Sequence, residues 1–132
     1  MCNLGDIILV SNYKSNGNTL GRHSFIVISD EPDKIKGLDY DIICNAMSSF
    51  KSEEQKIKKL KYDGNFPIYN KDTIIENGND KDGFAKSEQF YYFNKDKIKY
   101  SVIGHVNPST FNLLISYIED LEIAIEHITD NL

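Results

Sequence analysis

The stretch DIILVS, from Asp6 to Ser11, is a short apolar run rich in isoleucine. β-Branched and apolar side chains in such a short run are typical of a buried strand. Two further runs have the same character: FIVIS at Phe25–Ser29 and YDIICNAM at Tyr40–Met47. A polar segment rich in Asn, Ser and Gly separates the first two runs, so we expect successive strands joined by loops.

The rest of the chain predicts shorter strands and one closing helix. Ser52 followed by Gln55 fits a capping box at the start of a short helix. After Asn107 and Pro108, an N-cap followed by proline, apolar residues recur every three or four positions, which predicts a helix over about 108–130. Weaker strand segments are expected at Phe66–Tyr69, Asp72–Ile75, Phe84–Lys86, Gln89–Phe93 and Tyr100–Val106, with Gly104 as a candidate bulge.

These elements indicate one domain over residues 1–132, of the α+β class and mainly β. Several short strands followed by a packed helix favour a small β-barrel or strongly bent sheet with helical cover. The hydrophobic fraction of 40% is enough for a packed core, and no apolar run approaches the roughly 20 residues of a membrane-spanning helix. The N-terminus has no secretory pattern, and Cys2 and Cys44 have no metal-ligand spacing. We therefore expect a cytoplasmic protein with reduced thiols and no membrane partner.

The charge is unevenly distributed along the chain. The formal net charge is −5, from 15 basic and 20 acidic side chains. From Asn107 onward there are five acidic residues and no Lys or Arg, so the first 106 residues carry 15 charges of each sign. An acidic protein is a poor general binder of nucleic acid, because phosphate contacts supply most of that affinity. A local basic surface on the neutral part of the chain is still compatible with this sum.

Three kinds of chemically useful group lie at the ends of predicted strands. Arg22 and His23 precede the second strand, while Ser48 and Ser49 follow the third. A cation, an imidazole and a hydroxyl suit cleavage of RNA without a metal or cofactor: histidine takes the 2′-hydroxyl proton, and arginine stabilises the phosphorane oxygens. The alternative is surface decoration for the Arg-His pair and strand termination for the serines.

Other polar and aromatic clusters have two interpretations each. A basic stretch directly follows Ser49 and either borders the same cleft or forms a solvated helix face; its members are Lys51, Lys56, Lys58, Lys59 and Lys61. The aromatic run Phe90–Phe93 either stacks on bases or, as we favour, is half core. His105 is expected to be structural, and His127 to lie near the end of the closing helix.

Five segments, taken in order, resemble the MazF/PemK/Kid family of toxin endoribonucleases. They are GDIILVS (Gly5–Ser11), RHSFIVIS (Arg22–Ser29), CNAMSSF (Cys44–Phe50), GFAKSEQFYYFNKDKI (Gly83–Ile98) and VIGHVNPSTFNLLISYI (Val102–Ile118). The resemblance covers nearly the whole chain. It implies a small, partly open SH3-like barrel with a C-terminal helix, usually a homodimer, that cuts single-stranded RNA without a metal. It also implies a cognate antitoxin protein that inhibits this activity, as in a type II toxin–antitoxin pair.

The resemblance also implies site residues, with two departures from the family pattern. The family's catalytic Arg falls on His23 and the usual following Pro on Ser24, while its active-site Thr or Ser falls on Ser48. An acidic residue that some members carry in the first loop falls near Asn18. The expected catalytic residues are therefore His23, Ser48 and Arg22. The expected substrate-binding residues are Asn18, Thr19, Ser49, Lys51 and Lys56.

Two questions follow from the histidine at position 23. Neighbouring residues of a strand point to opposite faces, so if His23 faces the cleft, Arg22 should point away unless the chain there is irregular. Histidine is also largely neutral at pH 7 and lacks the donor fork of arginine. An inactive SH3-like barrel that binds protein or RNA is therefore the alternative to an endoribonuclease, and an interaction protein from a mobile element is a third interpretation.

Overall fold

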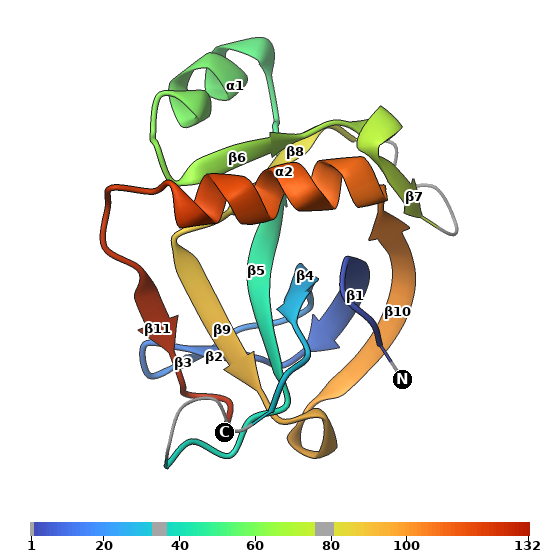
Figure 1. Ribbon diagram of the computed structural model, residues 1–132, viewed down its shortest axis with the longest axis vertical. Helices are drawn as coiled ribbons and strands as arrows, with labels where there is room; N and C mark the ends of the chain where they lie inside the picture. The colour runs from blue at the N-terminus through green and yellow to red at the C-terminus, as the bar shows by residue number, and fades with distance from the viewer. Residues whose placement is uncertain (1, 33–36, 76–80) are drawn as a thin grey trace.

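The computed structural model, which describes residues 2–32, 37–75 and 81–132, is mainly β, with a sheet that curls into a half-barrel and two α-helices (Figure 1). Its elements in chain order are β1 (Asp6–Ser11), β2 (Lys14–Ser15), β3 (Asn18–Thr19), β4 (His23–Ser29), β5 (Ile42–Ser49), α1 (Glu53–Leu60), β6 (Asn65–Ile68), η1 (Asn70–Asp72), β7 (Thr73–Ile75), β8 (Gly83–Lys86), β9 (Gln89–Phe93), η2 (Lys95–Lys97), β10 (Lys99–Val106), α2 (Pro108–Glu119) and β11 (Glu126–Ile128).

The sheet has β5 near its centre. The strand order is β11-β9-β5-β4-β1-β10-β7, and all of these pairs are antiparallel except β11 with β9. The first half of β5 pairs with β9, and its last three residues pair with β8, which in turn pairs with β6. One strand therefore runs through both the curled sheet and a smaller β6–β8 extension, and its end marks the junction between them.

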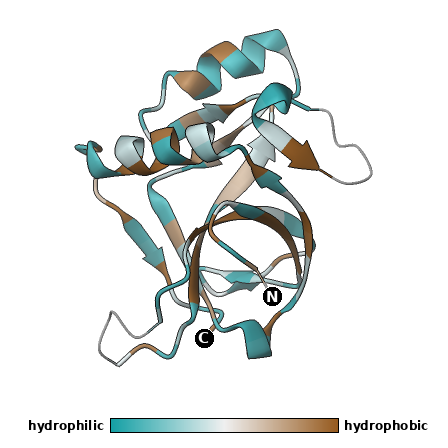
Figure 2. Ribbon diagram, turned by 45° about the vertical axis from the view of Figure 1, so that its right-hand side comes forward, coloured by the Kyte–Doolittle hydropathy of each residue, from teal (hydrophilic) through white to brown (hydrophobic). Residues whose placement is uncertain are grey.

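Side-chain alternation along the strands builds two hydrophobic clusters, one on each face. Phe25, Val27 and Ala46 belong to the first cluster, with Tyr91 and Phe93 from β9. The second cluster packs on the other face and contains Ile7, Ile26, Ile68, Ala85, Val106 and Leu114. Leu114 comes from α2, so this helix covers the second cluster. By contrast, α1 buries none of its residues and is mostly hydrophilic (Figure 2).

Most predicted elements are confirmed, because the local signals that define them are strong. The strands predicted at Asp6–Ser11, Phe25–Ser29 and Tyr40–Met47 correspond to β1, β4 and β5. The capping residue of α1 is Ser52, whose Oγ accepts a hydrogen bond from Gln55 N at 3.0 Å. The Gln55 side chain reaches back one residue further than a standard capping box, accepting from Lys51 N at 2.6 Å.

The predicted extent of the C-terminal helix was wrong. The helix begins at Pro108 as expected but ends at Glu119 instead of near residue 130. Beyond it the half-buried residues Leu121, Ile123 and Ile125 alternate with exposed ones, which is the period of extended chain. The chain then forms β11 and pairs with β9, which buries Ile128 in the first cluster.

The position predicted for His127 was wrong for the same reason. This residue lies in β11, where its Nδ1 is 2.7 Å from the hydroxyl of Tyr92. A register shift between Ile7 and Ile8 leaves Ile103 as an extra residue on β10, next to the glycine at which we expected a bulge. Neither described helix is long and apolar enough to cross a bilayer.

Candidate functional site

The three predicted catalytic residues line one open cleft. Arg22 and His23 enter it from the start of β4, and Ser48 enters it from the end of β5. The remaining lining residues are Leu9, Ser24, Met47, Ser49 and Lys51. A guanidinium, an imidazole and a hydroxyl, contributed by segments about 25 residues apart, therefore share one surface.

The strand register explains why His23 and Ser48 meet. Phe25 of β4 is opposite Ala46 of β5, in an antiparallel pair. Two residues further along each strand, the same register places His23 opposite Ser48. Side chains two apart on a strand share a face, so both lie on the face of the first hydrophobic cluster, which contains Phe25 and Ala46. Cross-strand neighbours on one face are within side-chain reach.

Arg22 reaches the same cleft because it is outside the strand ladder. It is exposed and immediately precedes β4, so strand alternation does not dictate its direction. Lys51 is also exposed, in the two-residue connection that follows Phe50 and leads into α1. The cleft thus has exposed positive side chains at its rim and the more buried His23 in its wall.

His23 is held by two aromatic rings and the main chain. Its imidazole centroid is 5.8 Å from that of Tyr13 and 5.6 Å from that of Phe25, the latter edge-to-face. Burial lowers the pKa of His23, the positive charge of Lys86 lowers it further, and a hydrogen bond with the Met47 main chain opposes both effects. The imidazole is therefore neutral at pH 7, as a proton acceptor must be.

Lys86, at the end of β8, is a residue near the cleft that sequence reasoning missed. The strand register places β8 on the other side of β5 from His23, and the positive charge of Lys86 contributes to the lowered pKa of His23. The available signal was a single lysine directly after the apolar residues Gly83–Ala85, but the sequence does not say which strands pair. The next carboxylate along, Glu88, has a pKa raised by burial, and its Oε2 has no hydrogen-bond partner within the described residues.

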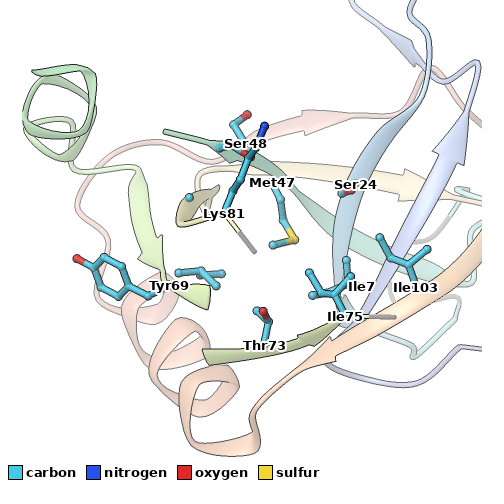
Figure 3. A pocket seen from close by; sticks show the side chains of 12 residues that line it. Ile7, Ser24, Met47, Ser48, Tyr69, Thr73, Ile75, Lys81 and Ile103 are labelled. Atoms are coloured by element: carbon cyan, nitrogen blue, oxygen red, sulfur yellow. The ribbon is translucent and has the colours of Figure 1, made fainter. Parts of the chain in front are cut away.

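A second, smaller pocket lies next to the cleft and shares four of its lining residues, Ser24, Met47, Ser48 and Ser49 (Figure 3). Met47 reaches into it towards Thr73 and Ile75, whereas Ser48 points away from them. Tyr69 also lines this pocket, and the ammonium of Lys56 is 5.0 Å from the centroid of its ring. Of the two predicted substrate-binding lysines, Lys51 therefore lines the His23 cleft, while Lys56 lies beside the second pocket.

Asn18 and Thr19 are exposed and do not line the cleft. They form β3, which pairs with β2 in a hairpin whose turn residues Asn16 and Gly17 both have positive φ. The hairpin is tied to the C-terminus: Lys14 N donates to Asn131 Oδ1 at 2.6 Å, and Gly17 N donates to Asp130 Oδ2 at 2.7 Å. These contacts fix the hairpin that carries Asn18 and Thr19 against the C-terminal residues.

The aromatic run of β9 is largely core, as we favoured. Tyr91, Tyr92 and Phe93 are buried, and Phe90 is half-buried with its ring 5.9 Å from that of His127. His105 is exposed on β10, away from the cleft lining. Neither histidine is therefore brought near Ser48.

Within residues 2–32, 37–75 and 81–132, no group of three or more His, Cys, Asp or Glu side chains is arranged to hold a metal ion. Comparison of the chain with protein-family models and with curated proteins finds no match.

Proposed function

We propose that this protein is a metal-independent endoribonuclease that cleaves single-stranded RNA. The observation that carries the proposal is the shared cleft of Arg22, His23 and Ser48, in which the histidine pKa is lowered. A neutral imidazole beside exposed cations is the combination needed to deprotonate a ribose hydroxyl next to a bound phosphate.

In the proposed reaction His23 accepts the proton of the 2′-hydroxyl. The 2′-oxygen attacks the adjacent phosphorus, the bond from phosphorus to the 5′-oxygen breaks, and the leaving oxygen takes up a proton. The products are a 2′,3′-cyclic phosphate and a 5′-hydroxyl. Arg22 stabilises the negative charge that develops on the phosphorane, and the Ser48 hydroxyl donates a hydrogen bond to the same phosphate.

The hydrogen bond with Met47 supports the assignment of His23 as base. One ring nitrogen is engaged by the main chain, and in the proposed reaction the other accepts the proton. The contacts with Tyr13 and Phe25 fix the plane of the ring, so the accepting nitrogen is oriented before substrate arrives.

The test is incubation of the purified protein with a long single-stranded RNA in excess EDTA. We expect cleavage that leaves 2′,3′-cyclic phosphate ends, and a loss of about 100-fold or more in His23→Gln. A matched control is His105→Gln, which changes an exposed histidine outside the cleft and should cleave like the wild type. Intact RNA at high protein concentration would contradict the proposal.

We further propose that the curled sheet is an SH3-like, partly open barrel of the MazF/PemK/Kid type. On this proposal the protein is cytoplasmic, forms a homodimer and is inhibited by a cognate antitoxin protein. Growth arrest on expression, relieved by the product of the adjacent gene, tests the toxin–antitoxin assignment. A monomer by light scattering at micromolar concentration would contradict the homodimer.

The competing function is a catalytically inactive barrel that binds protein or RNA. It is favoured by the neutral imidazole at position 23, which leaves no fixed positive charge at that point of the strand. Tight binding of single-stranded RNA without cleavage, or stable co-purification with a protein partner, would support this alternative over the nuclease.

A further inference from the structure

Lys86 lies on the same face of the sheet as His23 and Ser48. In β8, Ala85 is opposite Met47 of β5 and packs in the second hydrophobic cluster. Its neighbour Lys86 therefore points to the other face, which is the face of the first cluster and of the cleft wall. The register that pairs Ala85 with Met47 places Lys86 opposite Ala46.

The small side chain of Ala46 separates Lys86 from β4. Ala46 is also opposite Phe25, two residues from His23, so Lys86 and His23 flank β5 from its two edges. Two strands that are separated by a third strand lie about 10 Å from each other. A lysine and a histidine side chain can together span this distance when only a methyl group lies between them. The effect of the Lys86 charge on His23 agrees with this placement.

The positive charge of Lys86 is available to a ligand. Lys86 is half-buried and forms no ion pair within the described part of the chain. The carboxyl group of Glu88, two residues along the chain, lies against Gly64. It is so close that a Cβ added to that glycine would collide with it. Burial raises the pKa of this carboxyl, and the positive charge of Lys86 partly opposes that rise. A half-buried ammonium that forms no ion pair is suited to an anionic group.

We propose that Lys86 binds the scissile phosphate and supplies, from the inner side of the cleft, the fixed positive charge that His23 does not carry. The phosphate then lies between Lys86 on β8 and the Arg22 side chain at the rim. His23 and Ser48 form the side of the site from which the ribose hydroxyl is activated. This inference rests on the proposed function and adds a residue to its site.

The experiment compares Lys86→Met, which keeps the length of the side chain, with Lys86→Arg, which keeps its charge. Lys97→Met in η2 is the matched control, since it removes an exposed lysine outside the cleft. Proton NMR follows the titration of the imidazole, assigned from the signal missing in His23→Gln. Binding is measured on an RNA carrying 2′-O-methyl groups, which cannot be cleaved, and cleavage on the unmodified RNA in EDTA.

We expect Lys86→Met to raise the pKa of His23, because it removes a positive charge that disfavours the imidazolium. Cleavage should fall about 100-fold. The slope of the logarithm of RNA affinity against the logarithm of salt concentration should become shallower by about one. Lys86→Arg should restore the titration and most of the cleavage, which a purely structural role for the lysine stem would not require.

The inference is overturned if the wild type cleaves RNA and Lys86→Met retains its cleavage rate, its salt dependence and its histidine titration. It is also overturned if Lys97→Met has the same effects, because the charge would then act through the general field of the protein. Failure of the wild type to cleave would instead overturn the proposed function, and the titration alone would show whether Lys86 and His23 are neighbours.

Discussion

Gly83 controls how closely β8 approaches the end of β5 that carries Ser48. A Cβ added at this glycine would collide with the Ser48 carbonyl oxygen and would lie 3.1 Å from the Ser48 carbonyl carbon and 3.2 Å from Ser49 Cα. All three atoms belong to the main chain, so no side chain can move aside. In Gly83→Ala the two strands must separate by about 1 Å, which is the overlap of a methyl group with a backbone oxygen.

We expect this separation to cost about 3 kcal/mol of unfolding free energy. One or two strand hydrogen bonds weaken, at about 1 kcal/mol each, and strain in the crowded pair adds a similar amount. For a chain of 132 residues this corresponds to a melting temperature lower by about 10 °C. Because the Ser48 main chain shifts with the strand, RNA cleavage should also fall well below that of the wild type at temperatures where the variant is folded.

Thermal and urea denaturation followed by circular dichroism measure the effect, with Gly21→Ala as the matched control. A Cβ at Gly21 meets no atom within 4 Å, so that substitution should be neutral or stabilising by up to about 1 kcal/mol. Equal stability of Gly83→Ala and Gly21→Ala would show that β8 does not approach β5 as closely as described. The placement of Lys86 beside β5 would then be wrong as well.

Three other predictions concern titration and capping. Cleavage should require neutral His23, so the acid limb of the rate profile should lie below the ordinary histidine pKa of 6.5; a limb above that value would contradict the burial of the ring. Glu88 has a folded-state pKa raised above 4.5, so its contribution to stability is present at lower pH and is lost as pH rises through the raised value. Glu88→Gln should therefore reduce the fall in unfolding free energy over that range, measured by urea denaturation at several pH values, and an unchanged slope would contradict it. Ser52→Ala should destabilise α1 by about 1 kcal/mol in amide hydrogen exchange while changing the melting temperature little, because α1 buries no residue; a large change in melting temperature would show that α1 supports the core.

Local sequence signals predicted the strands and the beginnings of the helices. Runs such as DIILVS and FIVIS have one stable environment, the interior of a sheet, whatever their partners. Ser52 and Pro108 act within a few residues of their own position, so α1 and the start of α2 could be predicted without tertiary information. The end of α2 could not, because Ile125 and Ile128 fit helical spacing as well as the strand that β9 stabilises by pairing.

For the site, the sequence alone identified residues suited to the chemistry, namely Arg22, His23 and Ser48 at strand ends. Whether they share a surface depends on the register of β4 against β5, which involves residues about 25 positions apart and leaves no local trace. The same holds for Lys86, whose charge acts on His23 because β5 changes partner from β9 to β8 at its end. Strand propensity is a property of a short segment, whereas strand pairing is decided by the packing of the whole sheet, and in this protein the pairing assembles the cleft.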